Sequence, residues 1–278
     1  MKHRIGHFSA SCCLLFLLLA DAPTQSGVVD GGVIMDKRMN ENLCALTFDD
    51  GPSSFTPRLL DMLDEYGIPA TFFLVGQMAE KYPDTVRRIV AEGHEVGNHS
   101  WAHPNLRRIS RERKLEEIVR TNEILTGLGA RPRYLRPPYG AFDDYVVEVA
   151  GGLGLDVILW STDSKDWRRL PASYAELRNG RGTVYPQGTM RGIFLFHDTH
   201  KRTVDDLPRI VKELREAGCE QFVTVGEYMD GLLDPEPGML MSRRPVASFP
   251  PKTSADALSR HTELPKIELA GRAAAAPE

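Results

Sequence analysis

The sequence predicts an α/β protein built on a parallel sheet that is covered by helices. Short apolar runs of strand length alternate with longer segments whose apolar residues recur at helical spacing. Strands that alternate with helices are typical of parallel sheets, because a parallel pair needs a crossover connection. With 42% hydrophobic and 26% charged residues among 278, the chain has enough apolar surface for a large core. The pattern alone does not separate a closed barrel from an open doubly wound sheet.

The first elements are marked by apolar runs and by the residues that stop them. Leu43 to Phe48 is an apolar run too short for a helix, and turn residues follow it. We expect a helix from about residue 56 to Gly67, where glycine ends it. Ala70 to Val75 predicts a second buried strand, and residues 83–92 predict a second helix.

The remaining elements continue the same alternation. The predicted helices are 110–126, 143–151, 172–178 and 203–217, and the predicted strands are Tyr134–Arg136, Asp156–Trp160, Ile193–Phe196 and Gln221–Val225. Polar residues of interest lie at or just after the C-terminal ends of these strands, where parallel α/β barrels place their active sites.

The two ends of the chain differ from the middle in composition. A basic start precedes an apolar run, Cys12 to Ala20, and small residues follow it, which predicts a secretion signal over residues 1–22. The run is short for a membrane span, and an uncleaved anchor is the alternative. Residues 23–39 predict a flexible lead-in, 40–235 the folded domain, and 236–278 a disordered tail. We therefore expect a secreted or periplasmic protein.

Two cysteines, Cys44 and Cys219, lie outside the predicted signal and tail. Export permits a disulfide between them. Cys44, however, lies inside a predicted strand, where cysteine often serves as a small buried hydrophobic residue. Two cysteines define no disulfide framework, so both interpretations stay open and the unbridged one is favoured.

The charge of the chain limits the class of partner. The formal net charge is −4 at pH 7, and no basic cluster of the kind that binds nucleic acid or an anionic membrane stands out. A neutral or cationic polymer fits this charge better than a polyanion does. We expect no stable protein partner and a monomer.

Two adjacent carboxylates end the first predicted strand. Asp49 and Asp50 are followed directly by Gly51 and Pro52, which turn the chain away. Consecutive residues of an extended chain point to opposite sides, so one carboxylate can bind a metal while the other stays free as a base. The alternative is that the two acids only open a turn, as aspartate often does.

A histidine pair supplies the second half of a candidate metal site. His99 and His103 are four residues apart, so on one helical turn, ended by Pro104, both imidazoles would share a face. With Asp50 they would make three protein ligands and leave a position open, which is the arrangement of catalytic sites. Zinc fits two nitrogens and one oxygen, and cobalt, nickel and manganese are also compatible.

Five short segments carry most of the residues suited to chemistry. They are Phe48-Asp49-Asp50-Gly51-Pro52, His99 to His103, Arg136-Pro137-Pro138-Tyr139, Asp163 to Trp167, and Ile193 to Asp198. In this order they resemble the NodB-homology polysaccharide deacetylases, metal-dependent carbohydrate esterases that remove N-acetyl groups from polymeric sugars. The resemblance covers about residues 40–230 and implies a distorted (β/α) barrel of seven to eight strands.

The resemblance also implies roles for the residues around the metal. Asp49 corresponds to the general base, and Arg136 would hold it in place and keep it ionised, as a nearby cation does. Tyr139 corresponds to the residue whose backbone N–H binds the developing oxyanion, although its side chain is equally a candidate sugar contact. His197 corresponds to the general acid, and Asp166 to the carboxylate that keeps its imidazole charged. Trp167 and Leu195 would wall the pocket for the acetyl methyl group.

Four other polar residues are left out of the predicted site. His94 and His200 are interpreted as a strand-entry residue and an exposed loop residue, and Asp198 as a turn residue. Asp163 is expected to orient its neighbours rather than bind the metal.

Together these observations predict metal-dependent hydrolysis of N-acetyl groups on an N-acetylglucosamine polymer, such as peptidoglycan or a chitin-type oligomer, with release of acetate. The first alternative is an O-acetyl esterase that acts on xylan or another wall polymer. A second alternative, from another class, is a carbohydrate-binding protein without catalytic activity. That alternative predicts damage to the acid, base or ligand positions, and all of these positions are intact.

Overall fold

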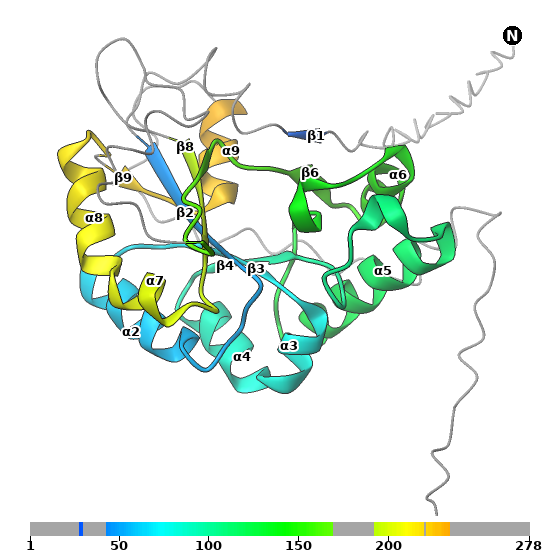
Figure 1. Ribbon diagram of the computed structural model, residues 1–278, viewed down its shortest axis with the longest axis horizontal. Coiled ribbons are helices and arrows are strands. Elements are labelled where there is room, and N and C mark those ends of the chain that lie inside the picture. The colour runs from blue at the N-terminus through cyan, green and yellow to red at the C-terminus, as the bar shows by residue number, and fades with distance from the viewer. Residues whose placement is uncertain (1–27, 30–42, 169–191, 220, 234–278) are drawn as a thin grey trace, which may run out of the picture.

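The computed structural model describes residues 28–29, 43–168, 192–219 and 221–233 (Figure 1). The predicted signal, tail and 172–178 helix lie outside these residues, and so does the lead-in apart from Val28 and Val29. These assignments therefore stay predictions. In the described part of the chain, no helix combines the length and the apolar character that a membrane span requires.

The strands form one parallel sheet with the order β1-β6-β5-β4-β3-β2-β8-β7, and β9 pairs with β2. All pairings between described residues are parallel. The strands are β1 (Val28–Val29), β2 (Leu43–Asp49), β3 (Thr71–Leu74), β4 (Glu95–Asn98), β5 (Tyr134–Leu135), β6 (Asp156–Ile158), β7 (Thr162–Asp163), β8 (Gly192–His197) and β9 (Gln221–Phe222). The sheet curls into a barrel. Within the described ranges this barrel is incomplete, because β1 and β7 at the ends of the order do not pair with each other. The predicted barrel class is confirmed.

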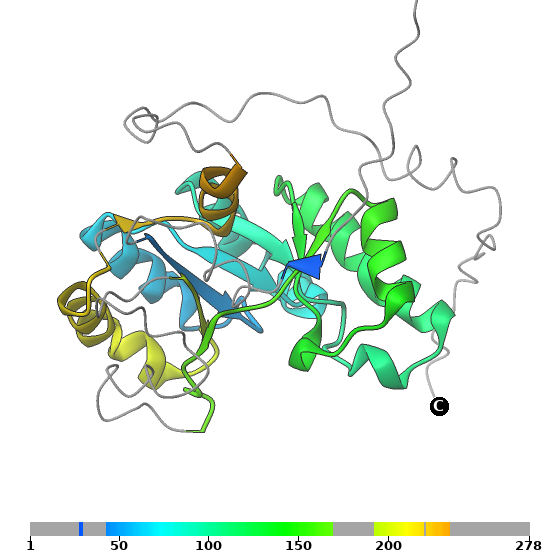
Figure 2. The ribbon, with the colours of Figure 1, turned by 90° about the horizontal axis from the view of Figure 1, so that it is seen from above.

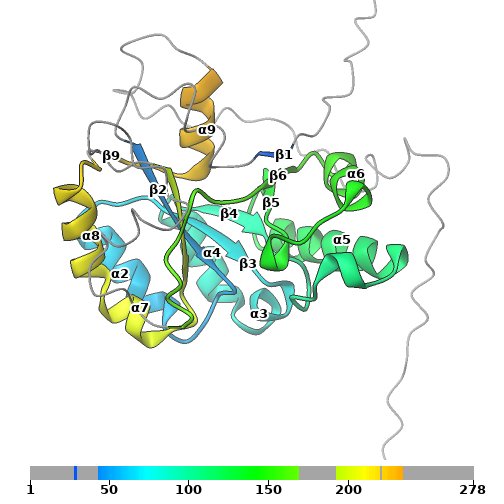
Figure 3. The ribbon, with the colours of Figure 1, turned by 45° about the horizontal axis from the view of Figure 1, so that its top comes forward.

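Helices form an outer arc around the strands (Figure 1). They are α2 (Thr56–Tyr66), α3 (Gly76–Lys81), α4 (Pro83–Ala91), α5 (Arg111–Gly127), α6 (Asp144–Gly152), α7 (Lys201–Asp205), α8 (Leu207–Glu216) and α9 (Val225–Leu233), with short 3-10 turns at Leu106–Arg108 and Pro138–Gly140. Seen from above, α5 and α6 lie on one side of the molecule and α7 and α8 on the other (Figure 2). Figure 3 shows β2, β3 and β4 next to one another, in front of α2 and α4.

Side chains alternate between the helical layer and the inside of the barrel along β8. Phe194 and Phe196 pack into the large cluster between sheet and helices, whereas Ile193 packs into the inner cluster with Phe73 and Tyr228 of α9. This alternation follows from the strand period of two. By the same alternation, Leu195 and His197 share the inward face with Ile193.

The structure contains a disulfide between Cys44 and Cys219, which were favoured as unbridged. Cys44 lies in β2, Cys219 follows α8, and the two are 175 residues apart in sequence. Both are buried, so burial of Cys44 in a strand did not argue against a bridge. The bridge connects the N-terminal half of β2 to the segment that follows α8.

Strands β1, β4 and β7 were not predicted, and three further element assignments were wrong. The helix α3 begins at Gly76, where only a strand end was expected. The predicted helix 203–217 is divided into α7 and α8, because Pro208 at the start of α8 lacks the N–H that a continuous helix needs. The last strand ends at Phe222 rather than at 225, and α9 follows it.

The start of α9 has a sequence signal that the predicted elements did not include. Thr224 Oγ1 accepts a hydrogen bond from the Glu227 N–H at 3.1 Å, and Glu227 Oε2 accepts one from the Thr224 N–H at 2.9 Å. This reciprocal pair is a capping box, which a threonine followed three residues later by a glutamate predicts.

Candidate active site

The predicted site residues gather at the C-terminal edge of the sheet. Asp49 and His197 end β2 and β8 and lie opposite each other in the parallel register. His99 directly follows β4, and Arg136 directly follows β5. Segments that are far apart in sequence therefore meet because parallel strands end at the same edge.

Asp50, His99 and His103 form a cluster suited to a metal ion. They offer three ligand atoms that all lie within 4.8 Å of one another. Asp50 Oδ1 lies 3.3 Å from His99 Nε2 and 3.1 Å from His103 Nε2. Within the described residues this oxygen is buried and has no hydrogen-bond partner. A buried carboxylate oxygen that faces two imidazole nitrogens fits a shared divalent cation, because the cation would satisfy all three atoms.

The orientation of His99 leaves its ligand nitrogen free. Its Nδ1 lies 2.6 Å from the backbone oxygen of Arg136, which can only accept a hydrogen bond, so Nδ1 carries the proton. Nε2 then presents a lone pair toward Asp50, as metal-binding histidines do. Burial raises the pKa of Asp50, but the neighbouring His103 and His99 rings, when charged, outweigh it and hold the pKa well below the ordinary range for aspartate.

The two histidines lie on a loop, so the predicted helical turn was wrong. Residues 99–105 contain no helix, and Ser100 and His103 have φ values of 64° and 56°. The left-handed region interrupts a right-handed turn. The rings nevertheless approach, with centroids 5.0 Å apart.

Asp49 forms a buried ion pair with Arg136. Arg136 is completely buried, and its Nη1 donates to Asp49 Oδ1 at 2.8 Å and to Thr47 Oγ1 at 2.7 Å. Its Nη2 donates to the Leu159 carbonyl at 2.9 Å, and its guanidinium lies 3.9 Å from the centroid of the Phe73 ring. These contacts fix the guanidinium, which in turn fixes the carboxylate.

The second oxygen of Asp49 faces the histidine cluster. Asp49 Oδ2 lies 3.8 Å from His99 Nε2. One oxygen is therefore held by Arg136, and the other is directed toward the atoms that could hold a metal.

His197 forms a second buried pair, with Asp166. His197 Nδ1 donates to Asp166 Oδ1 at 2.7 Å, and the His197 backbone N–H donates to Asp166 Oδ2 at 2.8 Å. Thr203 Oγ1 also donates to Oδ2, at 2.8 Å. Burial alone would lower the pKa of His197, but the hydrogen bond and charge of Asp166 outweigh it and raise the pKa to about 9. Burial raises the pKa of Asp166, whereas its bonds to His197 lower it below the ordinary value.

The three residues predicted to contact substrate differ in exposure. Tyr139 is 68% exposed and packs edge-on against the His103 ring, with centroids 4.7 Å apart. Trp167 is 51% exposed, and Leu195 is buried on the inward face of β8. The two exposed aromatic side chains lie on segments that also carry site residues.

Backbone strain is concentrated at the same edge of the sheet. Among the described residues, the non-glycine residues with positive φ are Asp50, Ser100, His103, Tyr139 and Lys165. Each lies in a loop that follows a strand. Such conformations persist only where the surroundings enforce them, and they gather at functional sites.

Asp198 was missed by the sequence analysis, which interpreted it as a turn residue. It is completely buried, its carboxylate accepts a hydrogen bond from Thr56 Oγ1, and its backbone oxygen accepts one from Ser53 Oγ at 2.8 Å. Burial raises the pKa of Asp198 to about 7. A Cβ on Gly51 would lie 2.4 Å from the carboxylate, so only glycine fits there. Asp198 therefore ties the end of β8 to the turn after Asp50, a contact without a sequence signal.

The other three residues left out of the predicted site, His94, Asp163 and His200, have local partners. His94 Nδ1 accepts a hydrogen bond from the Ala70 N–H at 3.1 Å, so its ring is satisfied as expected. Asp163 Oδ1 accepts one from the Lys165 N–H at 2.8 Å. His200 is half-buried at the start of α7, and its ring centroid lies 6.0 Å from that of His197.

The edge of this parallel α/β barrel combines the Asp50, His99 and His103 cluster with the Asp49–Arg136 pair and the His197–Asp166 pair. Such a combination is typical of hydrolases that use a divalent cation. Residues 36–158 match the family described as polysaccharide deacetylase. The chain belongs to this family of enzymes, which hydrolyse amide bonds. The resemblance stated from the five sequence segments is confirmed.

Two relatives and one solved structure place the chain within the family. The peptidoglycan-N-acetylglucosamine deacetylase of Bacillus cereus is 38% identical over 192 residues, which are 67% of this chain and 68% of that protein. The peptidoglycan-N-acetylmuramic acid deacetylase PdaC of Bacillus subtilis is 38% identical over 193 residues, which are 68% of this chain but only 39% of that protein. The crystal structure of the Bc1960 peptidoglycan N-acetylglucosamine deacetylase has a TM-score of 0.59 at 37% identity and covers 68% of this chain and 88% of that one.

Proposed function

We propose that the protein removes N-acetyl groups from N-acetylglucosamine residues of an extracellular or periplasmic polysaccharide, releasing acetate. This proposal rests on one observation, which is that three groups of side chains lie together at one edge of the sheet. These are the Asp50, His99 and His103 cluster, the Asp49–Arg136 pair and the His197–Asp166 pair. The peptidoglycan and chitin deacetylases among its relatives support this class of substrate.

Asp50, His99 and His103 would hold the metal. Zinc fits these ligands best, and cobalt, nickel or manganese would also be accepted. A divalent cation here would polarise the amide carbonyl and make a water molecule more acidic. Residues of this chain accept and donate the protons and position the substrate.

Asp49 acts as the general base. Its Oδ1 is held by Arg136, while Oδ2 faces the ligand cluster at 3.8 Å from His99 Nε2. A water that attacks the amide carbon beside this cluster transfers its proton to Oδ2. Arg136 prevents the carboxylate from turning away and balances its charge.

His197 acts as the general acid. Its Nδ1 is bonded to Asp166, so Nε2 is the nitrogen that delivers a proton. As the carbon–nitrogen bond breaks, the nitrogen of the sugar receives this proton and leaves as an amine, and the acetyl group leaves as acetate. A pKa of about 9 keeps His197 protonated at neutral pH, as an acid requires.

The strained loop at Tyr139 completes the site. With φ at 61°, Tyr139 turns its backbone away from the path of β5, and its N–H would donate to the oxyanion that forms on the carbonyl oxygen. Trp167 and Leu195 would enclose the acetyl methyl group, and the exposed Tyr139 ring is suited to contact a sugar face. The signal over residues 1–22 would export the enzyme, which we expect to act as a monomer.

A comparison of two substrates distinguishes this proposal from the alternative that the protein is an O-acetyl esterase. The purified protein would be incubated with N-acetylglucosamine oligomers and, separately, with acetylxylan, and acetate release would be measured on both. We expect turnover on the N-acetylated oligomers to exceed that on the xylan ester. Turnover confined to acetylxylan would support the esterase, and no turnover on any acetylated glycan, with metal bound, would support a binding protein.

A further inference from the structure

The loop that carries both histidines is supported on one side by α3. The Gly76 N–H donates to the Ser100 carbonyl at 2.9 Å, and the Gln77 N–H donates to the Trp101 carbonyl at 3.0 Å. A Cβ on Gly76 would lie 2.3 Å from the Trp101 ring, so the helix approaches the loop as closely as only glycine allows. These contacts satisfy two carbonyl groups of the loop but none of its N–H groups.

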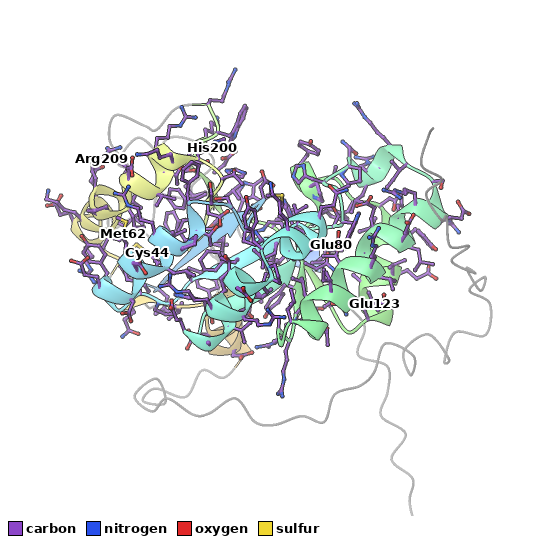
Figure 4. All side chains as sticks on the ribbon, turned by 90° about the horizontal axis from the view of Figure 1, so that it is seen from below. Cys44, Met62, Glu80, Glu123, His200 and Arg209 are labelled. Carbon is purple, nitrogen blue, oxygen red and sulfur yellow. A yellow bond between two sulfur atoms is a disulfide. The ribbon has the colours of Figure 1, made fainter. Side chains whose placement is uncertain are left out.

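One side chain of α5 accepts two of the three N–H groups between the ligands, and the third, of Ser100, donates to Asn98 Oδ1. Glu117 Oε2 accepts hydrogen bonds from the Trp101 N–H and the Ala102 N–H, each at 2.7 Å. Glu117 is completely buried. Figure 4, where Glu80 marks α3 and Glu123 marks α5, shows the two helices side by side, and Arg120 of α5 lies 3.7 Å from Glu80.

Two residues of α5 near Glu117 bear on the test of its role. Arg113 is its charge partner, and Glu116 is a matched control position. Arg113 Nη2 lies 2.7 Å from Glu117 Oε1, so the two form an ion pair. The other nitrogen, Nη1, lies 2.8 Å from Oε2 of Glu116, which is 40% exposed. Glu116 and Glu117 thus share an arginine and a helix, but only Glu117 reaches the loop.

We propose that Glu117 is a positioning residue that sets the metal affinity by holding the loop from His99 to His103 in its ligating shape before the metal binds. The inference rests on the proposed function only in taking Asp50, His99 and His103 as the ligands. The loop cannot hold itself by helical hydrogen bonds, since Ser100 and His103 have positive φ. Without Glu117 the two buried N–H groups would lack an acceptor, and the loop would relax to find one. The spacing of the histidines would then change.

The test compares Glu117→Gln with Glu116→Gln by zinc affinity, measured by competition with a chromogenic chelator. An amide accepts these hydrogen bonds more weakly than a carboxylate and presents N–H groups to Arg113. We expect the zinc dissociation constant to rise about 10- to 100-fold in Glu117→Gln, the range for residues that orient metal ligands, and to stay within about twofold in Glu116→Gln.

The unfolding temperature of the metal-free proteins separates positioning from packing. A Glu117→Gln variant that melts earlier without metal but binds zinc as tightly as the wild type would overturn the inference. That outcome would leave the proposed function standing, whereas a wild-type protein that binds no divalent metal would overturn both.

A measurement on the wild type covers the case in which Glu117→Gln does not fold. Hydrogen exchange of the metal-free protein reports whether the loop is held before the metal arrives. We expect slow exchange of the Trp101 and Ala102 amides, because both are bonded to Glu117. Exchange at the rate of an open loop would contradict the inference.

Discussion

The site contains two buried ion pairs that hold opposite kinds of group. In one, Arg136 holds Asp49, so a cation stabilises a charged carboxylate. In the other, Asp166 holds His197, so a carboxylate stabilises a charged imidazole. The two held groups lie opposite each other at the ends of β2 and β8.

Under the proposed function, this difference gives the direction of proton transfer. A carboxylate accepts a proton, and an imidazolium donates one. The two pairs also differ in what surrounds them. Arg136 is completely buried and bonded through both terminal nitrogens, whereas His197 uses Nδ1 for Asp166 and its Nε2 makes no hydrogen bond to a described residue. In the proposed mechanism, Arg136 fixes the base on the side away from the metal ligands, and the acid has Nε2 for the leaving group.

Asp49→Asn should have the largest effect. The amide keeps the shape of the side chain but cannot accept the proton, so kcat for acetate release should fall by about 10²- to 10⁴-fold. Zinc content, measured by mass spectrometry of the purified variant, should stay at the wild-type level. An unchanged rate would contradict the assignment of Asp49 as base.

Asp166→Asn should affect the second pair and shift the pH dependence. Asp166 raises the pKa of His197 to about 9, so activity that needs the imidazolium should decline as pH rises through about 9. Without the carboxylate the basic limb of kcat/KM should move to lower pH, toward the ordinary histidine value of 6.5, and the rate at pH 8 should fall about 10²-fold. A limb that does not move would show that another group is the acid.

The same pair predicts a trend in stability. Since the folded pKa of His197 lies above the ordinary 6.5, the pair stabilises the fold fully below pH 6.5, and this contribution is lost as pH rises through about 9. Urea unfolding of the wild type and Asp166→Asn across this interval should give free energies of unfolding whose difference shrinks toward high pH. A constant difference would contradict the coupling.

Replacing both Cys44 and Cys219 by alanine should change stability but spare the chemistry. The bridge closes a loop of 175 residues, so its loss should lower the free energy of unfolding by about 3–5 kcal/mol. The two ion pairs lie at the other end of β2, and kcat at 25 °C should stay within about twofold of the wild type. A large loss of kcat in the folded variant would show that the site depends on the distant bridge.

Tyr139→Ala should have the smallest effect. Its backbone N–H is retained, and only the exposed ring is lost. If the ring binds sugar equally in the ground and transition states, KM for the oligomer should rise about three- to tenfold with little change in kcat. A selective fall in kcat would instead place the ring in the chemistry.

Most of the site was predictable because its residues follow recognisable strands. Asp49, Asp50 and His197 end or follow apolar runs, so their meeting at one edge follows from a parallel sheet. Arg136 was predicted through the family resemblance, and its segment follows a predicted strand.

The missed features depend on contacts that sequence spacing does not encode. The histidine pair lies on a loop because α3 and Glu117 bind its backbone, and both partners are distant in sequence. The same holds for Asp198, whose bonds to Ser53 and Thr56 cross more than a hundred residues. The prediction that Cys44 and Cys219 are unbridged was wrong, because a cysteine suits a strand interior with or without a partner.

The central claim is that the Asp50 cluster holds a metal that works with the two proton-transfer pairs on an N-acetylated glycan. The direct measurement is acetate release from N-acetylglucosamine oligomers by the purified protein before chelation, after chelation, and after zinc is restored, with Asp49→Asn as a metal-loaded control. The account predicts release that disappears with the chelator, returns with zinc, and is absent from the control throughout. Release that persists after complete removal of the metal would contradict it.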